Sequence, residues 1–528
     1  MARQKTRRQF LHAGATADTV FGLGEWAGLL PLSPANADEA KVTPDLVRFG
    51  PDLEPIVKLI EDTPREKCVA MMVEQLRKGV PYRIFMAALY HIQTNQVGHP
   101  LAVLHSAHEL SLDLPAQERL LPLFWALDSF KFHQQRGDFA SSRKPLTGLK
   151  PLAGKLPSAD QAEQEFHAAM QAFDGERAER VIVAVTRGQG AARVAELVWH
   201  YGARDFTFIG HFAIWTANCW RPLQTVGWQH AEPILRVVVA SIVGQDKALR
   251  GQPYAANGER VRKALDGLPA GWAEAGADAD LTKDLLVLIR ERKVDAACQL
   301  TVTQLTEGKA KAGAVWDAVH LAAGEMIMCA QKNAAPLHAN TAANALHYAF
   351  QASGQVENRL LILLQAVGWM CLYRSSLARN NWLKEPKQIT EIVGAKIPER
   401  SDQAVEEILA HLSFGPGGNP TADPIEGARG PQLISQPWRH EAASKVFAFA
   451  KQFADHRPLV REAFRLVSLK ADWNPHRIKF PVAAWENCGW VSPEWRPHLL
   501  AAASYSFFGA DALDTEVAKQ AREAAWKL

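Results

Sequence analysis

The segment around residue 105 carries two histidines three residues apart, with a carboxylate directly after the second: His105, His108 and Glu109. Residues three and four apart share a face of an α-helix, so the three side chains would border one surface. Two imidazoles and a carboxylate placed in this way can bind a transition metal. The alternative is that both histidines are ordinary core or surface residues.

A second segment, from Trp199 to Pro233, combines histidines, carboxylates, tryptophans and glycines at high density. Its candidates for chemistry are His200, Asp205, His211, His230 and Glu232. Gly202 and Gly210 predict a break in any helix that would join His200 to His211. We expect the functional site in this segment, against the alternative of a buried polar network that only fixes packing.

Asp205 stands directly before an aromatic stretch. A carboxylate buried among aromatic rings needs a partner, and Arg204, Arg221 or a histidine could provide it. We predict catalytic roles for Asp205, His211 and Glu232, in which a carboxylate orients a metal-bound imidazole or moves a proton.

A third segment contains His338 just before a predicted helix start, with Asn340 or Thr341 as the N-cap. A histidine and an amide at a helix N-terminus can bind an anion or supply a metal ligand, although capping alone also accounts for the pattern. Upstream, Asp317 and His320 stand three residues apart, an arrangement used in carboxylate-bridged di-iron bundles.

These segments lie far apart in the chain, yet each has the composition of a buried helix. Buried imidazoles need hydrogen-bond partners or a metal, so we predict that at least three of the histidines converge on one metal or haem. Iron or haem is the favoured cofactor, with zinc or copper as alternatives. The candidate ligands are His105, His108, His200, His211, His230 and His338. The competing hypothesis is separate burial, with each imidazole bonded to a backbone carbonyl.

Two of these strings resemble a known family. The run Gly98-His99-Pro100-Leu101 with the helix after it, and His338 with Thr341 and the run 344–346, are similar to the questin oxidase-like proteins. Those proteins are helical oxygenases of polyketide ring cleavage. The resemblance covers a small part of the chain and implies oxidation chemistry.

The elements that must position these residues are predicted to be helices. Apolar residues recur at intervals of three and four, as in the run from Leu281 to Ile289, and strand-like alternation is scarce. The best strand candidate, 181–185, is also compatible with a buried helix. Loops are predicted at 136–160, 250–280 and 413–432, which are rich in Gly and Pro. The expected fold is mainly α, with irregular helical bundles or an array of helical hairpins.

The domain organisation follows from these breaks. Residues 1–37 are predicted to be an export signal, and 38–412 a helical domain that carries the site, with a possible subdivision at 250–280. Residues 433–528 are predicted to form a C-terminal, tryptophan-rich helical region.

The N-terminus carries the most specific signal of the chain. The run from Thr6 to His12, with the pair Arg7-Arg8, resembles a twin-arginine (Tat) export signal, and the small residues 35–37 read as its cleavage site. Two acidic residues in the intervening apolar stretch depart from that pattern. A Tat signal implies the Tat export machinery as a partner and a periplasmic or secreted location. This route carries folded proteins, often with a cofactor already bound.

Composition limits the other function classes. The 528-residue chain has a net charge of +3, and cleavage after residue 37 would leave its charges nearly balanced, so neither nucleic acid nor an anionic membrane is an expected partner. No long uncharged apolar window predicts a stable membrane span. The six cysteines include no Cys-x-x-Cys pair, and buried free thiols are the simpler interpretation.

The predicted function is therefore an exported oxidoreductase that uses a His-ligated metal or haem on a small-molecule substrate, and the family resemblance implies that it is oxygenase-like. The alternative is a non-enzymatic helical scaffold or small-ligand-binding protein of the periplasm. The 16 tryptophans could line such a binding surface, although most are more simply core anchors.

Overall fold

The computed structural model describes residues 52–93, 99–136, 155–243, 253–330, 334–383, 387–413, 437–471, 474–510 and 512–525. Within these ranges the chain is helical, and the extended pairing consists of one isolated antiparallel bridge between Ala330 and Leu383. The predicted mainly-α fold is confirmed. The predicted export signal, residues 1–37, lies outside the described residues, so export and the periplasmic location stay predictions.

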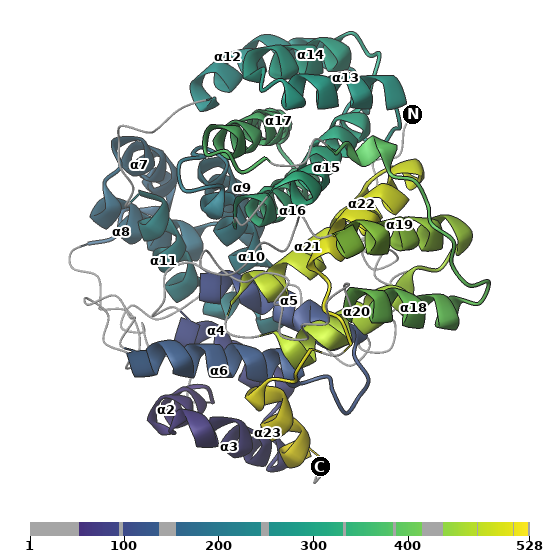
Figure 1. Cartoon of the computed structure of the whole chain (residues 1–528). Coiled ribbons are helices and arrows are strands. Elements are labelled where there is room, and N and C mark those ends of the chain that lie inside the picture. The colour runs from purple at the N-terminus through teal and green to yellow at the C-terminus, as the bar shows by residue number, and fades with distance from the viewer. Residues whose placement is uncertain are drawn as a thin grey trace, which may run out of the picture.

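Four helices form a closed ring at the centre of the molecule. Around this ring α5 contacts α10, α10 contacts α16, α16 contacts α21, and α21 contacts α5 again (Figure 1). The helices of this central bundle are α5 (His99–Asp113), α10 (His211–Val226), α16 (Ala334–Ala352) and α21 (His476–Trp490). Since these segments are widely separated in sequence, the bundle interior brings distant residues together.

The remaining helices surround this bundle in four groups. One group packs beside α10: α7 (Ala159–Ala172), α8 (Gly175–Gly188), α9 (Ala191–Gly202) and α11 (Ala231–Val243). A second covers α16: α12 (Tyr254–Ala264), α13 (Ala279–Arg290), α14 (Val294–Thr306), α15 (Ala312–Cys329) and α17 (Val356–Arg379). A third lies beside α21: α18 (Ser401–Ser413), α19 (Pro437–Gln452), α20 (Arg457–Lys470) and α22 (Arg496–Ala503).

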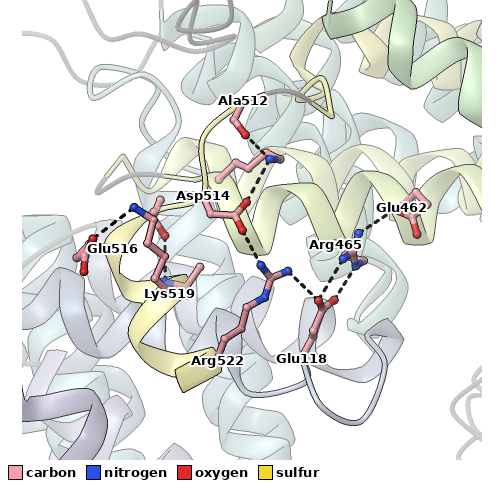
Figure 2. Close-up of polar contacts among 11 residues, drawn as sticks. Glu118, Glu462, Arg465, Ala512, Asp514, Glu516, Lys519 and Arg522 are labelled. Atoms are coloured by element: carbon pink, nitrogen blue, oxygen red, sulfur yellow. Dashed lines mark hydrogen bonds and ion pairs between the residues drawn. The ribbon is translucent and has the colours of Figure 1, made fainter. Parts of the chain in front are cut away.

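The fourth group holds both described ends of the chain (Figure 1). It consists of α2 (Glu54–Asp62), α3 (Arg65–Arg77), α4 (Tyr82–Ile92), α6 (Leu121–Arg136) and α23 (Glu516–Ala525). Figure 2 shows how α23 is held: Arg522 donates to Asp514 at 2.6 Å and to Glu118 at 3.1 Å. Arg465 of α20 reaches the same Glu118 at 2.8 Å. These contacts connect α23 to α20 and to Glu118, which lies in the segment before α6.

Local sequence decides several of these elements. Residues 181–185 lie in α8, whose N-cap Asp174 accepts a hydrogen bond from the backbone of Arg177, so the apolar run is a buried helix rather than a strand. The loop predicted for 250–280 is wrong over α12, because Val261 and Ala264 form a buried face that stabilises a helix despite Gly258. The other two predicted loops, 136–160 and 413–432, lie mostly outside the described residues.

Two further predictions concern burial. All six cysteines are buried and free, as expected from their apolar surroundings. Within the described ranges, α17 is long and apolar enough to cross a membrane by length and composition, but most of that stretch is buried inside the protein. This burial is typical of a core helix.

Candidate functional site

Three histidines from three helices of the central bundle meet at one level of its interior. His211 and His476 are the first residues of α10 and α21, and His338 lies one turn into α16. The Nε2 atom of His338 is 2.9 Å from that of His211 and 3.2 Å from that of His476. We call this set the histidine layer. The structure thus brings together two of the predicted ligands, His211 and His338, with a third histidine that the sequence analysis did not select.

The other ring nitrogen of each histidine contacts an oxygen that can only accept. Nδ1 of His211 lies 2.6 Å from the carbonyl oxygen of Phe208, and Nδ1 of His338 lies 2.7 Å from that of Ala334. Nδ1 of His476 lies 2.8 Å from Oδ1 of Asn474. Each Nδ1 therefore carries the proton, and in the neutral ring Nε2 is an acceptor. Three acceptor nitrogens face one another, so their mutual contacts are not hydrogen bonds.

The surroundings keep these rings neutral. Burial lowers the pKa of His211 to about 4 and holds the pKa values of His338 and His476 well below the ordinary histidine value. Lys479, one turn after His476 on α21, is itself buried, and burial lowers its pKa to about 7. The positive form of Lys479 further depresses the histidine pKa values. At neutral pH, proton binding to this layer is disfavoured.

Two other histidine pairs in the chain are ordinary hydrogen bonds. Nε2 of His91 lies 2.8 Å from Nδ1 of His230, and Nε2 of His320 lies 2.8 Å from Nδ1 of His347. In each pair one ring can donate to the other. The amide of Gln351 also reaches Nε2 of His347 at 3.1 Å, which leaves Nδ1 of His347 to donate to His320. The histidine layer differs from these pairs because its contacting nitrogens are all acceptors, whereas each pair joins a donor to an acceptor.

The spacing of the histidine layer is slightly tighter than a metal site requires. Two ligands 2.0–2.1 Å from a tetrahedral metal stand about 3.3 Å apart. Among the described residues, no group of three or more histidines, cysteines or carboxylates already surrounds a point suited to a metal ion. For a metal to bind His338 together with either neighbour, the Nε2 contacts of 2.9 and 3.2 Å would have to widen to about 3.3 Å.

A second polar layer lies further along the same bundle, and each of the four helices contributes one residue. We call it the ion-pair layer; its members are His105, Arg221, Asn344 and Glu486. Nη1 of Arg221 donates to Nε2 of His105 at 2.6 Å and to Oε2 of Glu486 at 2.9 Å. Nδ2 of Asn344 donates to the same carboxylate at 2.8 Å. Burial opposes ionisation of Glu486, but Arg221 and His105 outweigh it and lower the pKa of Glu486 to about 2.

The remaining predicted ligands lie apart from the histidine layer. His105 belongs to the ion-pair layer, and Nδ1 of His108 contacts the hydroxyl of Tyr82 at 2.7 Å. Nε2 of His200 contacts the hydroxyl of Tyr254 at 2.7 Å, and His230 pairs with His91. The predicted convergence therefore fails for these four, because each finds its hydrogen bond in a different helix pair. The predicted break between His200 and His211 is confirmed, since α9 ends at Gly202 and α10 begins at His211.

The two carboxylates predicted as catalytic also lie in structural contacts. Oδ1 of Asp205 accepts a 2.8 Å hydrogen bond from the backbone N–H of Thr207, as well as one from its hydroxyl, and so shapes a turn rather than meeting an arginine or histidine. Glu232 forms a bidentate ion pair with Arg187 at 2.9 and 3.0 Å. Neither contact involves a candidate metal ligand.

The predicted cap at residues 340–341 is wrong, because α16 already begins at Ala334. The side chain of Asn340 donates to the backbone of Ala323, and Thr341 donates to the backbone of Leu337 one turn earlier. The helix starts sooner because residues 335–347 are almost wholly apolar or buried, which favours packing over termination.

Sequence reasoning missed His476 and Lys479. They stand in the run His476-Arg477-Ile478-Lys479, where the histidine has no second histidine at helical spacing and Pro475 separates it from the carboxylate of Asp472. The available signal was the three-residue separation, which places an imidazole and an amine on one helix face. Only the packing of α21 against α16 brings this pair to His338.

Comparison with known proteins leaves the site to be interpreted on its own geometry. No family model, no curated protein and no solved structure matches this chain.

Proposed function

We propose that the histidine layer binds a transition metal through Nε2 of His211, His338 and His476, and that the protein is a metal-dependent oxidoreductase. The observation that carries the proposal is the direction of the protons. All three Nδ1–H groups point to oxygens while the three acceptor nitrogens face one another. Metal-binding histidines use this arrangement, in which the outer N–H is held by a carbonyl or similar oxygen.

The low pKa values support the same proposal. Acceptor nitrogens in contact repel one another, and a cation placed among them turns this repulsion into attraction. A proton is a poor candidate at neutral pH because burial depresses the pKa of each ring. Neutral imidazoles suit zinc, copper, iron and nickel, and a bound iron or copper would supply one-electron chemistry with a small-molecule substrate.

The surroundings of His211 favour a substrate whose part next to this ring is aromatic or apolar. The ring of Phe208 lies 4.5 Å from that of His211 and is 41% exposed, and Trp215 lies 5.5 Å from His211 on the same helix. His476 is half-buried, whereas Lys479 is fully enclosed. With a pKa near 7, the Lys479 amine can accept or release a proton at neutral pH.

Export through the Tat route stays part of the proposal and rests on residues 7–8 and 35–37.

Metal analysis of the full chain tests this proposal. The protein is purified without chelators, and its bound metal is measured by mass spectrometry beside His338→Ala and His230→Ala. The first variant removes the central member of the histidine layer. The second removes one member of an ordinary His–His pair, which makes it a matched control. We expect about one metal per chain in the wild type and in His230→Ala, and none in His338→Ala.

A wild-type chain that takes up no iron, copper or zinc, even when these are supplied, contradicts the proposal and favours the non-enzymatic scaffold. Equal loss of metal in both variants would also contradict it, because binding would then not depend on the histidine layer. If iron or copper is bound, oxygen consumption with aromatic test substrates separates an oxidoreductase from a protein that only stores metal.

A further inference from the structure

The segment that leads into α10, and so positions His211 in the histidine layer, packs against one face of α17. This segment, residues 203–210, joins α9 to α10. Three side chains at successive turns of α17 contact it: Gln365, Trp369 and Tyr373. Gln365 donates to the carbonyl oxygen of Ala203 at 2.6 Å, and Tyr373 donates to that of Ile209 at 2.7 Å. Spacing of four residues puts all three on one side of the helix.

The end of this segment holds a backbone conformation that its sequence disfavours. Ile209 has a φ of 44° and Gly210 a φ of 72°. A positive φ is rare for a β-branched residue and costs of the order of 1–3 kcal/mol, so surrounding contacts must maintain it. The hydroxyl of Tyr373 would lie 2.4 Å from a Cβ at Gly210, which shows how closely it fits this turn.

The same turn fixes the ring of His211. The carbonyl oxygen of Phe208, one residue before Ile209, lies 2.6 Å from Nδ1 of His211 and 3.0 Å from its backbone nitrogen. A change in φ at Ile209 would rotate the Phe208 carbonyl relative to α10. The ring would then lose the contact that keeps its proton on Nδ1 and its acceptor nitrogen toward His338.

We infer that Tyr373 is a positioning residue for the proposed metal site: its hydroxyl holds the 208–210 turn so that His211 presents Nε2 to the histidine layer. This inference rests on the proposed function. Tyr373 acts indirectly, because its hydroxyl contacts the carbonyl oxygen of Ile209 rather than a histidine of the layer. Core packing alone does not require the hydroxyl of Tyr373. The ring of Phe206 lies 4.8 Å from the Tyr373 ring and would pack equally well against a phenylalanine at position 373.

The test compares Tyr373→Phe with Tyr90→Phe. Tyr90 is also fully buried, and its hydroxyl also donates to a backbone carbonyl, that of Cys219 in the interior of α10. Both variants lose one buried hydroxyl, so similar losses of stability are expected. Zn²⁺ affinity is measured by competition with a chelator, and the absorption spectrum of the Co²⁺-loaded protein reports ligand geometry.

We expect Tyr373→Phe to weaken Zn²⁺ binding about 10-fold, within the range found when groups behind a ligand are removed, and to change the Co²⁺ spectrum. Tyr90→Phe should leave both unchanged. Wild-type affinity and spectrum in Tyr373→Phe would overturn the inference, as would equal changes in Tyr90→Phe.

A second measurement separates this inference from the proposed function. In metal-free protein with ¹⁵N-labelled histidine, the His211 signals, assigned by their loss in His211→Asn, report which ring nitrogen carries the proton. Tyr373→Phe should shift His211 from the Nδ1–H form toward a mixture, and Tyr90→Phe should not. If the wild type binds no metal, the proposed function fails while this readout still decides whether Tyr373 orients His211; an unchanged signal overturns the inference.

Discussion

The central bundle contains two buried polar layers that share α10, α16 and α21, and the two layers differ in how their buried polar groups are paired. In the ion-pair layer, the Arg221 guanidinium donates to a carboxylate and to an imidazole acceptor, so donors meet acceptors. In the histidine layer, acceptor nitrogens of His211, His338 and His476 meet one another. The contacts of the first layer pair donors with acceptors, although Nε and Nη2 of Arg221 lack a hydrogen-bond partner among the described residues, and we propose that the second layer binds a cation.

The difference shows that burial of polar groups alone does not identify a ligand site. It is also necessary to ask which ring nitrogen carries the proton and what that nitrogen contacts. Both layers contain histidines whose pKa values are lowered mainly by burial. What distinguishes them is the partner of each ring nitrogen. His105 accepts from an arginine, while His211 donates outward to a carbonyl and keeps its acceptor nitrogen toward the bundle interior.

The largest expected effect comes from breaking the ion-pair layer. Arg221→Met should lower the free energy of unfolding by about 3 kcal/mol, the lower end for buried pairs, because Glu486 keeps 22% of its side chain exposed. Urea denaturation of metal-free protein measures this. The matched change in the other layer, His338→Gln, should cost clearly less, since it removes an acceptor that faces acceptors. Equal costs would mean that the two layers are stabilised alike.

Metal should stabilise the histidine layer and leave the ion-pair layer unaffected. At a free Zn²⁺ concentration 100 times the dissociation constant, the free energy of unfolding should rise by about 2.7 kcal/mol in the wild type. Arg221→Met, although less stable, should gain a similar increment, and His338→Gln should gain none. Thermal denaturation with and without Zn²⁺ provides the measurement. A gain that survives in His338→Gln would place the metal elsewhere.

The carboxylate of the ion-pair layer should respond to acid in a lower pH range than the histidine layer. Free imidazoles in the unfolded chain bind protons near pH 6.5, whereas the pKa of folded His211 is about 4, so acid favours unfolding between these values. Each such histidine contributes a slope of about 1.4 kcal/mol per pH unit. Stability from Glu486, with a folded pKa of about 2, is present above pH 4.5 and lost as the pH falls toward 2.

Two substitutions separate these ranges in metal-free protein. His211→Gln should reduce the slope of unfolding free energy against pH between 6.5 and 4 by about 1.4 kcal/mol per pH unit, and Glu486→Gln should reduce the slope only below 4.5. The other buried histidines, whose pKa values are also lowered, keep the rest of the upper slope in both variants; they include His105, His338 and His476. An upper slope that His211→Gln leaves unchanged would show that folded His211 titrates normally.

The smallest effect is expected at Asp205, which the sequence suggested as catalytic. Its carboxylate accepts from the backbone of Thr207, and an asparagine oxygen can accept the same hydrogen bond. Asp205→Asn should therefore change the unfolding free energy by about 1 kcal/mol, because a hydrogen bond to a charged group becomes a neutral one, and leave Zn²⁺ affinity unchanged. A loss of affinity of tenfold or more would restore Asp205 to the site.

The sequence by itself determined the helical nature of the fold. Apolar residues at intervals of three and four can be buried together only on a helix, so α13 and α17 could be recognised without knowing what they pack against. Glycine also acted locally: Gly202 and Gly210 end α9 and precede α10, because a residue without Cβ accepts the positive φ found at Gly210. The burial of all six cysteines followed from their apolar neighbours in the same way.

Only the tertiary structure decided which histidines meet. His211, His338 and His476 lie on three different helices, and their meeting depends on the order in which α10, α16 and α21 pack around the bundle. Local spacing selected His105 with His108, yet Arg221 holds one and Tyr82 contacts the other. The physical reason is that helix periodicity, and even the local contact that orients each ring, depends on neighbouring residues, whereas the meeting of the Nε2 atoms depends on which helices pack side by side.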